Sequence, residues 1–139
     1  MEISDIKRRV VETIERARRL AGQRRAHADE AAREYEAFLD RIAIPIFKQV
    51  ANVLRAEGYL FTVFTPGGSV RLMSDRAAED YVELELDTTG DEPVVNGHAS
   101  RSRGRRVVES EAPIGPPATL TEEEVLSFVL KSLEPLVER

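Results

Sequence analysis

The chain has 139 residues, of which 42% are hydrophobic and 32% charged, and its formal net charge at pH 7 is -5. This length suits one domain with a real core, and the composition excludes a wholly disordered chain. The sequence contains no cysteine, which excludes disulfide frameworks, thiolate metal sites and thiol nucleophiles and is typical of a reducing compartment. No segment has the pattern of a leader or a membrane span, so we expect a cytoplasmic protein with no membrane partner.

A long helical region opens the chain. Residues 3–42 contain no proline and a single glycine, Gly22, and they are rich in the strong helix formers Ala, Arg and Glu. One line of residues through this region, which we call the seam, alternates steps of four and three as in a coiled coil. The seam residues that we predict to form an oligomer interface are Val10, Ile14, Ala17, Ala21, Ala28, Ala31, Tyr35 and Phe38.

The length of this helix limits how it can be buried. A helix of about 40 residues is roughly 60 Å long, nearly twice the width of a compact domain of this size. Either it breaks near Gly22 and folds back, or it stays continuous and pairs with a second copy. A lone glycine costs only about 1 kcal/mol in a helix, so we prefer the continuous helix. We therefore expect a homodimer or a higher oligomer, whose helices are either parallel or antiparallel.

Proline and glycine set the next boundaries. Pro45 interrupts the helical pattern and predicts a kink or short break at 43–45. The pattern then resumes, and Gly58 suits the end of a second helix at about residue 57. We treat 1–139 as one domain, with a helical oligomerisation region at 1–57 and a sheet-plus-helix region at 58–139.

Aromatic and β-branched residues predict five strands in an antiparallel meander. The third strand alternates strictly between its two faces, with Val82, Leu84 and Leu86 on one and Tyr81, Glu83, Glu85 and Asp87 on the other. The first strand is apolar on both faces, which predicts that it is central or covered on both sides. Residues 112–117 are expected to leave the sheet. The predicted strands are 59–65, 69–74, 81–87, 94–102 and 105–111.

The last helix has the clearest local signature in the sequence. Thr121 and Glu124 have the spacing of a capping box, and Leu120 with Val125 has that of a hydrophobic staple. The predicted fold class is thus α+β. It comprises a long N-terminal helix and a shorter second helix, a five-stranded antiparallel β-meander, and a C-terminal helix packed on the sheet.

Four arginines cluster at the predicted tip of the last hairpin and are the candidate anion-binding residues. One interpretation is that they grip phosphates, helped by the neighbouring glycine. The other is that they pair across strands with the acids of 81–87, and we prefer this self-paired arrangement. The four residues are Arg101, Arg103, Arg105 and Arg106.

The sequence carries no catalytic or metal-binding constellation that we can identify. Its two histidines, His27 and His98, have no second histidine or carboxylate at ligand spacing beside them. His98 is a candidate general base only if the fold brings a carboxylate to it. We therefore expect no enzyme activity, no cofactor and no metal.

Three functional hypotheses follow. The first is a non-enzymatic intracellular interaction protein, an adaptor or chaperone-like module, that self-associates through its long helix and contacts a further protein partner. The alternative is a nucleic-acid-associated dimer that uses the arginine-rich tip and the basic helix end, where residues 1–28 hold eight Lys and Arg against four acids. The third is an enzyme built around His98, which we do not favour.

Overall fold

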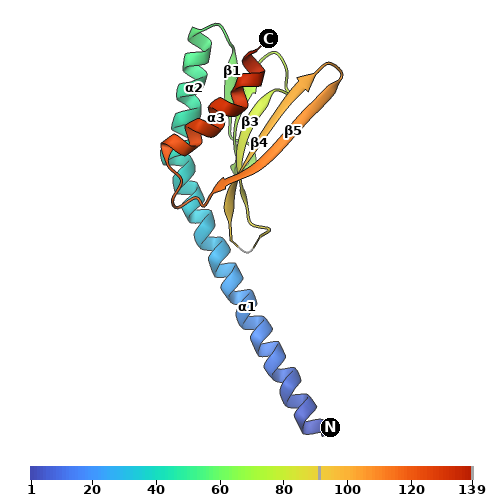
Figure 1. The fold of residues 1–139 in the computed structure, drawn as a ribbon. Coiled ribbons are helices and arrows are strands. Elements are labelled where there is room, and N and C mark those ends of the chain that lie inside the picture. The colour runs from blue at the N-terminus through green and yellow to red at the C-terminus, as the bar shows by residue number, and fades with distance from the viewer. Residues whose placement is uncertain (91, 139) are drawn as a thin grey trace.

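The N-terminal helices form one continuous rod. A computed structural model describes residues 1–90 and 92–138. Helix α1 (Ile3–Phe38) passes through Gly22 without a break and leads through a π-helical turn (Leu39–Ala43) into helix α2 (Ile44–Ala56). In Figure 1 the far end of α1 extends well beyond the rest of the molecule. The prediction of a helix that continues past Gly22 is confirmed.

The expected break at 43–45 is wrong, because the chain makes a π-helical turn there instead. The N–H of Ile44 donates to the carbonyl of Leu39, five residues back, and the backbone of Ala43 and Ile44 is helical. Pro45 lies in the first turn of α2, where proline's missing N–H is tolerated best. A local widening of the helix therefore accommodates this proline, as π-bulges commonly do in helices.

The five strands form one antiparallel sheet in the order β1-β2-β3-β4-β5, which confirms the meander. Strand β5 runs four residues further than expected, because Ala112 and Pro113 still pair with β4. A proline is tolerated there since β5 is an edge strand. The strands are β1 (Phe61–Phe64), β2 (Val70–Ser74), β3 (Tyr81–Asp87), β4 (Val94–Arg103) and β5 (Arg106–Gly115).

Strand β1 is the other edge of the sheet, so the expectation that it is central or doubly covered is wrong. Phe61 is buried, whereas Phe64 is exposed. Tyr59 and Leu60, which made the segment look apolar on both faces, precede the strand and are exposed as well. The apolar run 59–64 therefore consists of a short strand and two exposed residues that precede it, and no second layer among the described residues covers it.

Helix α3 (Glu122–Val137) begins at the predicted capping box. The Thr121 hydroxyl accepts the Glu124 N–H at 3.2 Å, and the Glu124 carboxylate accepts the Thr121 N–H at 3.3 Å. Leu120 and Val125 are both buried at this helix start, as a hydrophobic staple requires.

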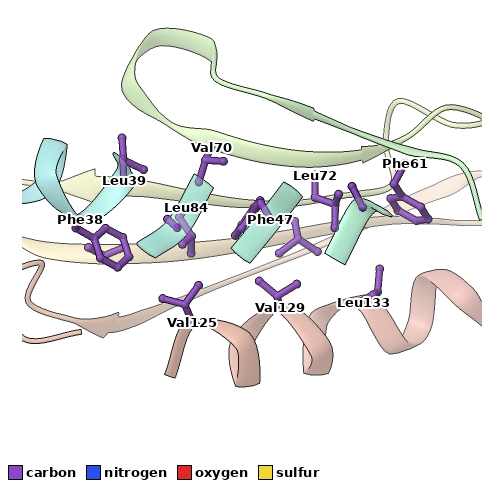
Figure 2. Packing of buried hydrophobic residues seen from close by; sticks show 14 of the residues in the cluster. Phe38, Leu39, Phe47, Phe61, Val70, Leu72, Leu84, Val125, Val129 and Leu133 are labelled. Carbon is purple, nitrogen blue, oxygen red and sulfur yellow. The ribbon is translucent and has the colours of Figure 1, made fainter. Parts of the chain in front are cut away.

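Both short helices cover the same face of the sheet. Helix α2 packs on β1 and β2, and α3 packs on β3, β4 and β5. Figure 2 shows side chains of both helices meeting those of the strands in one core. The largest fully buried side chains are Phe47, Val70, Leu72, Val82, Leu84, Val95, Val125 and Val129. This core leaves the other face of the sheet and most of α1 outside it.

Candidate functional site

The most conspicuous unpartnered element is the first part of α1, residues 3–28, which we call the stem. The stem contains no buried residue, because Ala31 is the first buried residue of the chain. Residues 29–90 and 92–138 form the body. The stem nevertheless carries large exposed apolar side chains, which are Ile3, Ile6, Val10, Val11, Ile14 and Leu20. Several large apolar groups on one free helix are typical of an interaction surface.

The structure divides the predicted interface residues between the stem and the core. Val10, Ile14 and Ala17 are exposed on the stem, and Ala21 and Ala28 are partly buried. The remaining three, Ala31, Tyr35 and Phe38, are buried within the body of the same chain. A second copy can therefore reach the seam only along the stem.

Tyr35 shows how the C-terminal end of the seam packs against the sheet of the same chain. Its hydroxyl donates to the Leu84 carbonyl at 3.3 Å, and its ring centroid lies 6.1 Å from that of Phe38. Burial and the neighbouring charges of Glu85 and Glu83 raise the pKa of Tyr35 well above its usual range. The two aromatic residues thus anchor α1 to the sheet.

Sequence reasoning missed two stem residues, Ile6 and Leu20. Both are exposed and lie beside the seam on the same side of the helix. The signal was present, because Ile3, Ile6, Val10, Thr13, Ala17 and Leu20 form a second line with alternating steps of three and four. Together the two lines make an apolar stripe of the width that a helix in a bundle presents, broader than a two-stranded seam.

The arginine-rich tip is not paired with the acids of β3, so our preferred interpretation of it is wrong. Strand β3 pairs with β4 only as far as Ser100, which leaves the tip beyond the end of β3. Arg103 instead lies directly opposite Arg106, on either side of a turn that contains Gly104 at φ +62°. No salt bridge among the described residues includes an arginine of the tip.

The open face of the sheet carries a cluster of interacting polar groups, in which the buried Nε of Arg71 has no hydrogen-bond partner. The Arg71 guanidinium contacts the Glu83 carboxylate at 3.0 Å and lies 4.1 Å from the centroid of the Tyr81 ring. Ser69 donates to the other Glu83 oxygen at 2.6 Å, which gives this buried carboxylate a partner on each side. Burial raises the pKa of Tyr81, and Arg71 opposes that rise. The Glu83 carboxylate thus has both the opposite charge and the hydrogen bond that a buried charge requires.

His98 lies at the edge of the same cluster. Its Nε2 and Nδ1 atoms are each 3.9 Å from a carboxylate, of Glu109 and Glu111 respectively, and its ring meets that of Tyr81 edge-on. The fold thus brings carboxylates to His98 that the sequence could not place. At 3.9 Å neither contact is a hydrogen bond, and both carboxylates are largely exposed. His27, on α1, is exposed.

No group of three or more His, Asp or Glu side chains among the described residues is arranged to hold a metal ion. No helix in the described part of the chain has the length and the apolar character that crossing a membrane would need.

Comparison of this chain with protein-family models, with curated proteins and with solved structures finds no match.

Proposed function

We propose that this chain is a non-enzymatic intracellular interaction protein that self-associates through its stem, with the body free to contact a further protein as an adaptor or chaperone-like module. The observation that carries the proposal is the exposed apolar stripe of the stem. Ile3 is 86% exposed, Val10 52% and Leu20 46%. Burying such side chains is worth about 1.5–3 kcal/mol each, which is the driving force for association.

Two properties of the stem support a second copy as its partner. The stripe has the spacing of helices that pair along their length. At its centre lie Ala17 and Ala21, and small side chains there let two helices approach closely. Lys7 and Arg24 are the charged residues on the stripe, and Asp29 and Glu30 follow Arg24 closely enough to offset its charge in an antiparallel pair.

The test is the absolute mass in solution by light scattering, at low and at high salt, for the wild type and two matched variants. Ala17→Glu with Ala21→Glu places two charges on the stripe. Gln23→Glu with Ala26→Glu adds the same charge to the opposite face, since nine residues from 17 to 26 correspond to two and a half turns. All four positions are helical, so the two variants alter helix propensity little.

We expect a dimer or higher oligomer that persists in high salt, dissociates in the stripe variant and survives in the control variant. Salt resistance is expected because an apolar interface is not screened. A monomeric wild type at high protein concentration would overturn the proposal. Equal dissociation of both variants would place the interface elsewhere on the stem and overturn the assignment to this stripe.

The structure also favours a second candidate, a nucleic-acid-associated dimer. The register leaves Arg103 and Arg106 facing each other, and no ion pair in the described chain neutralises the arginines of the tip. Like charges held this close favour a counterion, and phosphate is one that arginine binds well.

Salt dependence separates the two candidates. If the tip binds nucleic acid, affinity for a short duplex should fall steeply between about 50 and 200 mM salt, because each phosphate contact releases a counterion. Arg103→Gln with Arg106→Gln should then reduce both the affinity and the salt slope in a fluorescence anisotropy titration. An affinity that is unaffected by this change would exclude the tip as the nucleic-acid site.

A further inference from the structure

A second site lies on the body, far from the stripe, in the space between α3 and the β4–β5 hairpin. This space, which we call the α3 groove, has a volume of about 480 Å³. Small-molecule sites typically measure about 300–1,000 Å³. Ala99 and Ala112 of the strands line one side, and Phe128 and Leu136 of α3 line the other. In Figure 1 the hairpin bends away from the end of α3.

The groove exists because the last two strands carry small residues where the helix crosses them. Beneath the helices β2 and β3 present Leu72 and Leu84, both fully buried, whereas β4 and β5 present Gly97, Ala99 and Ala112. At Gly97 the Phe128 ring takes the space, because a Cβ built there would lie 2.4 Å from it. Further along the strands nothing comparable fills the gap. A concave surface with a mainly apolar lining and a few polar groups is typical of small-molecule sites.

The charges beside the groove define what can occupy it. Arg101 and Lys131 line it, and neither belongs to a salt bridge among the described residues. One acid, Glu111, also lines the groove, but its carboxylate turns toward His98, 3.9 Å away. The groove therefore combines an apolar lining with two uncompensated cations.

We propose that the α3 groove binds an aliphatic carboxylate, with the hydrocarbon chain along Ala99, Ala112 and Leu136 and the carboxylate at Arg101 and Lys131. The apolar lining accounts for the chain, since burial of methylene groups drives such binding. The cations account for the head group, because a guanidinium forms paired hydrogen bonds with a carboxylate. This site is separate from the stem and adds a small-molecule ligand to the proposed interaction protein.

Sodium dodecanoate, kept below its micelle concentration, is the probe. The full-length ¹⁵N-labelled chain is titrated and the backbone amide resonances are followed. We expect saturable shifts at the amides of Gly97, Ala112 and Lys131, with none in the stem. Dodecyltrimethylammonium, which has the same chain and the opposite charge, should bind at least about tenfold more weakly. Shifts confined to the stem, or equal binding of both amphiphiles, would overturn the proposal.

Two variants and a matched control locate the site. Arg101→Gln with Lys131→Gln should weaken dodecanoate binding roughly tenfold, since a charge-assisted hydrogen bond is worth about 1.5–3 kcal/mol. Arg33→Gln with Lys48→Gln removes the same charge from exposed positions outside the groove and should leave binding unchanged. A third variant, Ala99→Leu, fills the groove and should abolish saturable binding. Equal effects of the two charge variants would overturn the assignment of the carboxylate.

The outcome is independent of the proposed self-association. The stripe variant Ala17→Glu with Ala21→Glu alters only the stem and should bind dodecanoate with the wild-type affinity. A monomeric protein that still binds dodecanoate in the groove would overturn the proposed function and leave this inference standing. An oligomer whose groove amides do not shift on addition of dodecanoate would overturn this inference and leave the proposed function standing.

Discussion

Two glycines of this chain have opposite consequences for stability. Gly22 lies in the stem, where an added Cβ would meet nothing within 4 Å, whereas a Cβ at Gly97 would lie 2.4 Å from the Phe128 ring. Gly22→Ala should increase helix content, because alanine is favoured over glycine in a helix by about 1 kcal/mol. Gly97→Ala should lower the free energy of unfolding by roughly 1–3 kcal/mol, since it overpacks the contact between sheet and helix.

Urea unfolding followed by circular dichroism measures both effects. Gly97→Ala with Phe128→Ala is the informative double variant, because removal of the ring also removes the clash. If the free-energy changes of the two single variants simply add in the double variant, the clash between the added Cβ at position 97 and the Phe128 ring is not the cause of the destabilisation by Gly97→Ala.

Tyr35 predicts a loss of stability at high pH. Its folded-state pKa is raised by burial, so above about pH 10 the unfolded chain releases a proton that the folded chain retains. The free energy of unfolding should therefore fall with rising pH, by at most about 1.4 kcal/mol per pH unit for this group. The decline should level off once the pH passes the folded-state pKa.

Chemical denaturation between pH 8 and pH 11 tests this expectation. Tyr35→Phe should make the free energy of unfolding fall less steeply with pH. The fall that remains should include the contribution of Tyr81, whose pKa is also raised. Tyr59→Phe, at an exposed position, is the control and should leave the slope unchanged. An unchanged slope in Tyr35→Phe would show that the hydroxyl is not protected by the fold.

Among the elements, α3 depends most on a local signal. Thr121→Ala removes the hydroxyl that accepts the Glu124 N–H and should cost about 1 kcal/mol of stability. Thr121→Asp keeps an acceptor at the N-cap and should be close to neutral. Thermal unfolding of the wild type, Thr121→Ala and Thr121→Asp measures the three stabilities. Equal losses in the two variants would show that the cap hydrogen bond is not what stabilises the helix.

The β4–β5 hairpin has a like-charge pair at its tip. Arg106→Glu places an acid directly opposite Arg103 and should stabilise the hairpin by some tenths of a kcal/mol. Arg105→Glu is a matched control, because Arg105 lies in the turn and has no cross-strand partner in the register. Amide hydrogen exchange at positions 103 and 106 should slow in the Arg106→Glu variant only.

At the scale of the whole molecule, the stem should be dispensable for folding. Removal of residues 1–28 deletes no buried residue and starts the chain at Asp29, a carboxylate that suits the positive end of a helix. The shortened chain should keep the amide resonances of the body and be monomeric by light scattering. A body that unfolds on truncation would show that the stem contributes to stability within one chain.

Local patterns in the sequence were sufficient for most of the fold. Helix α3 was placed by Thr121 and Glu124, and β3 by strict alternation, because capping and pleating act between residues that are close in the chain. The same holds for α1, which contains no breaker strong enough to interrupt it. The position of β1 at an edge was missed, since neighbouring strands rather than local residues determine an edge.

The candidate surfaces show the same division. The seam was visible from spacing alone, but periodicity is the same whether a helix packs on its own sheet or on another molecule, so it could not tell Tyr35 from Ile14. The tip arginines were identified as a cluster, yet their partners depended on the register between β3 and β4. The sequence showed which residues share a helix face or a cluster, and long-range packing decided which of them remain exposed.

By itself the sequence determined the order and type of the elements, since propensity, capping and alternation are local interactions encoded in consecutive residues. Only the tertiary structure decided that the seam divides near Ala31, that the tip extends past β3, and that small residues beneath α3 leave a groove. Each of these depends on the distance between elements far apart in the chain, which packing of the whole core determines.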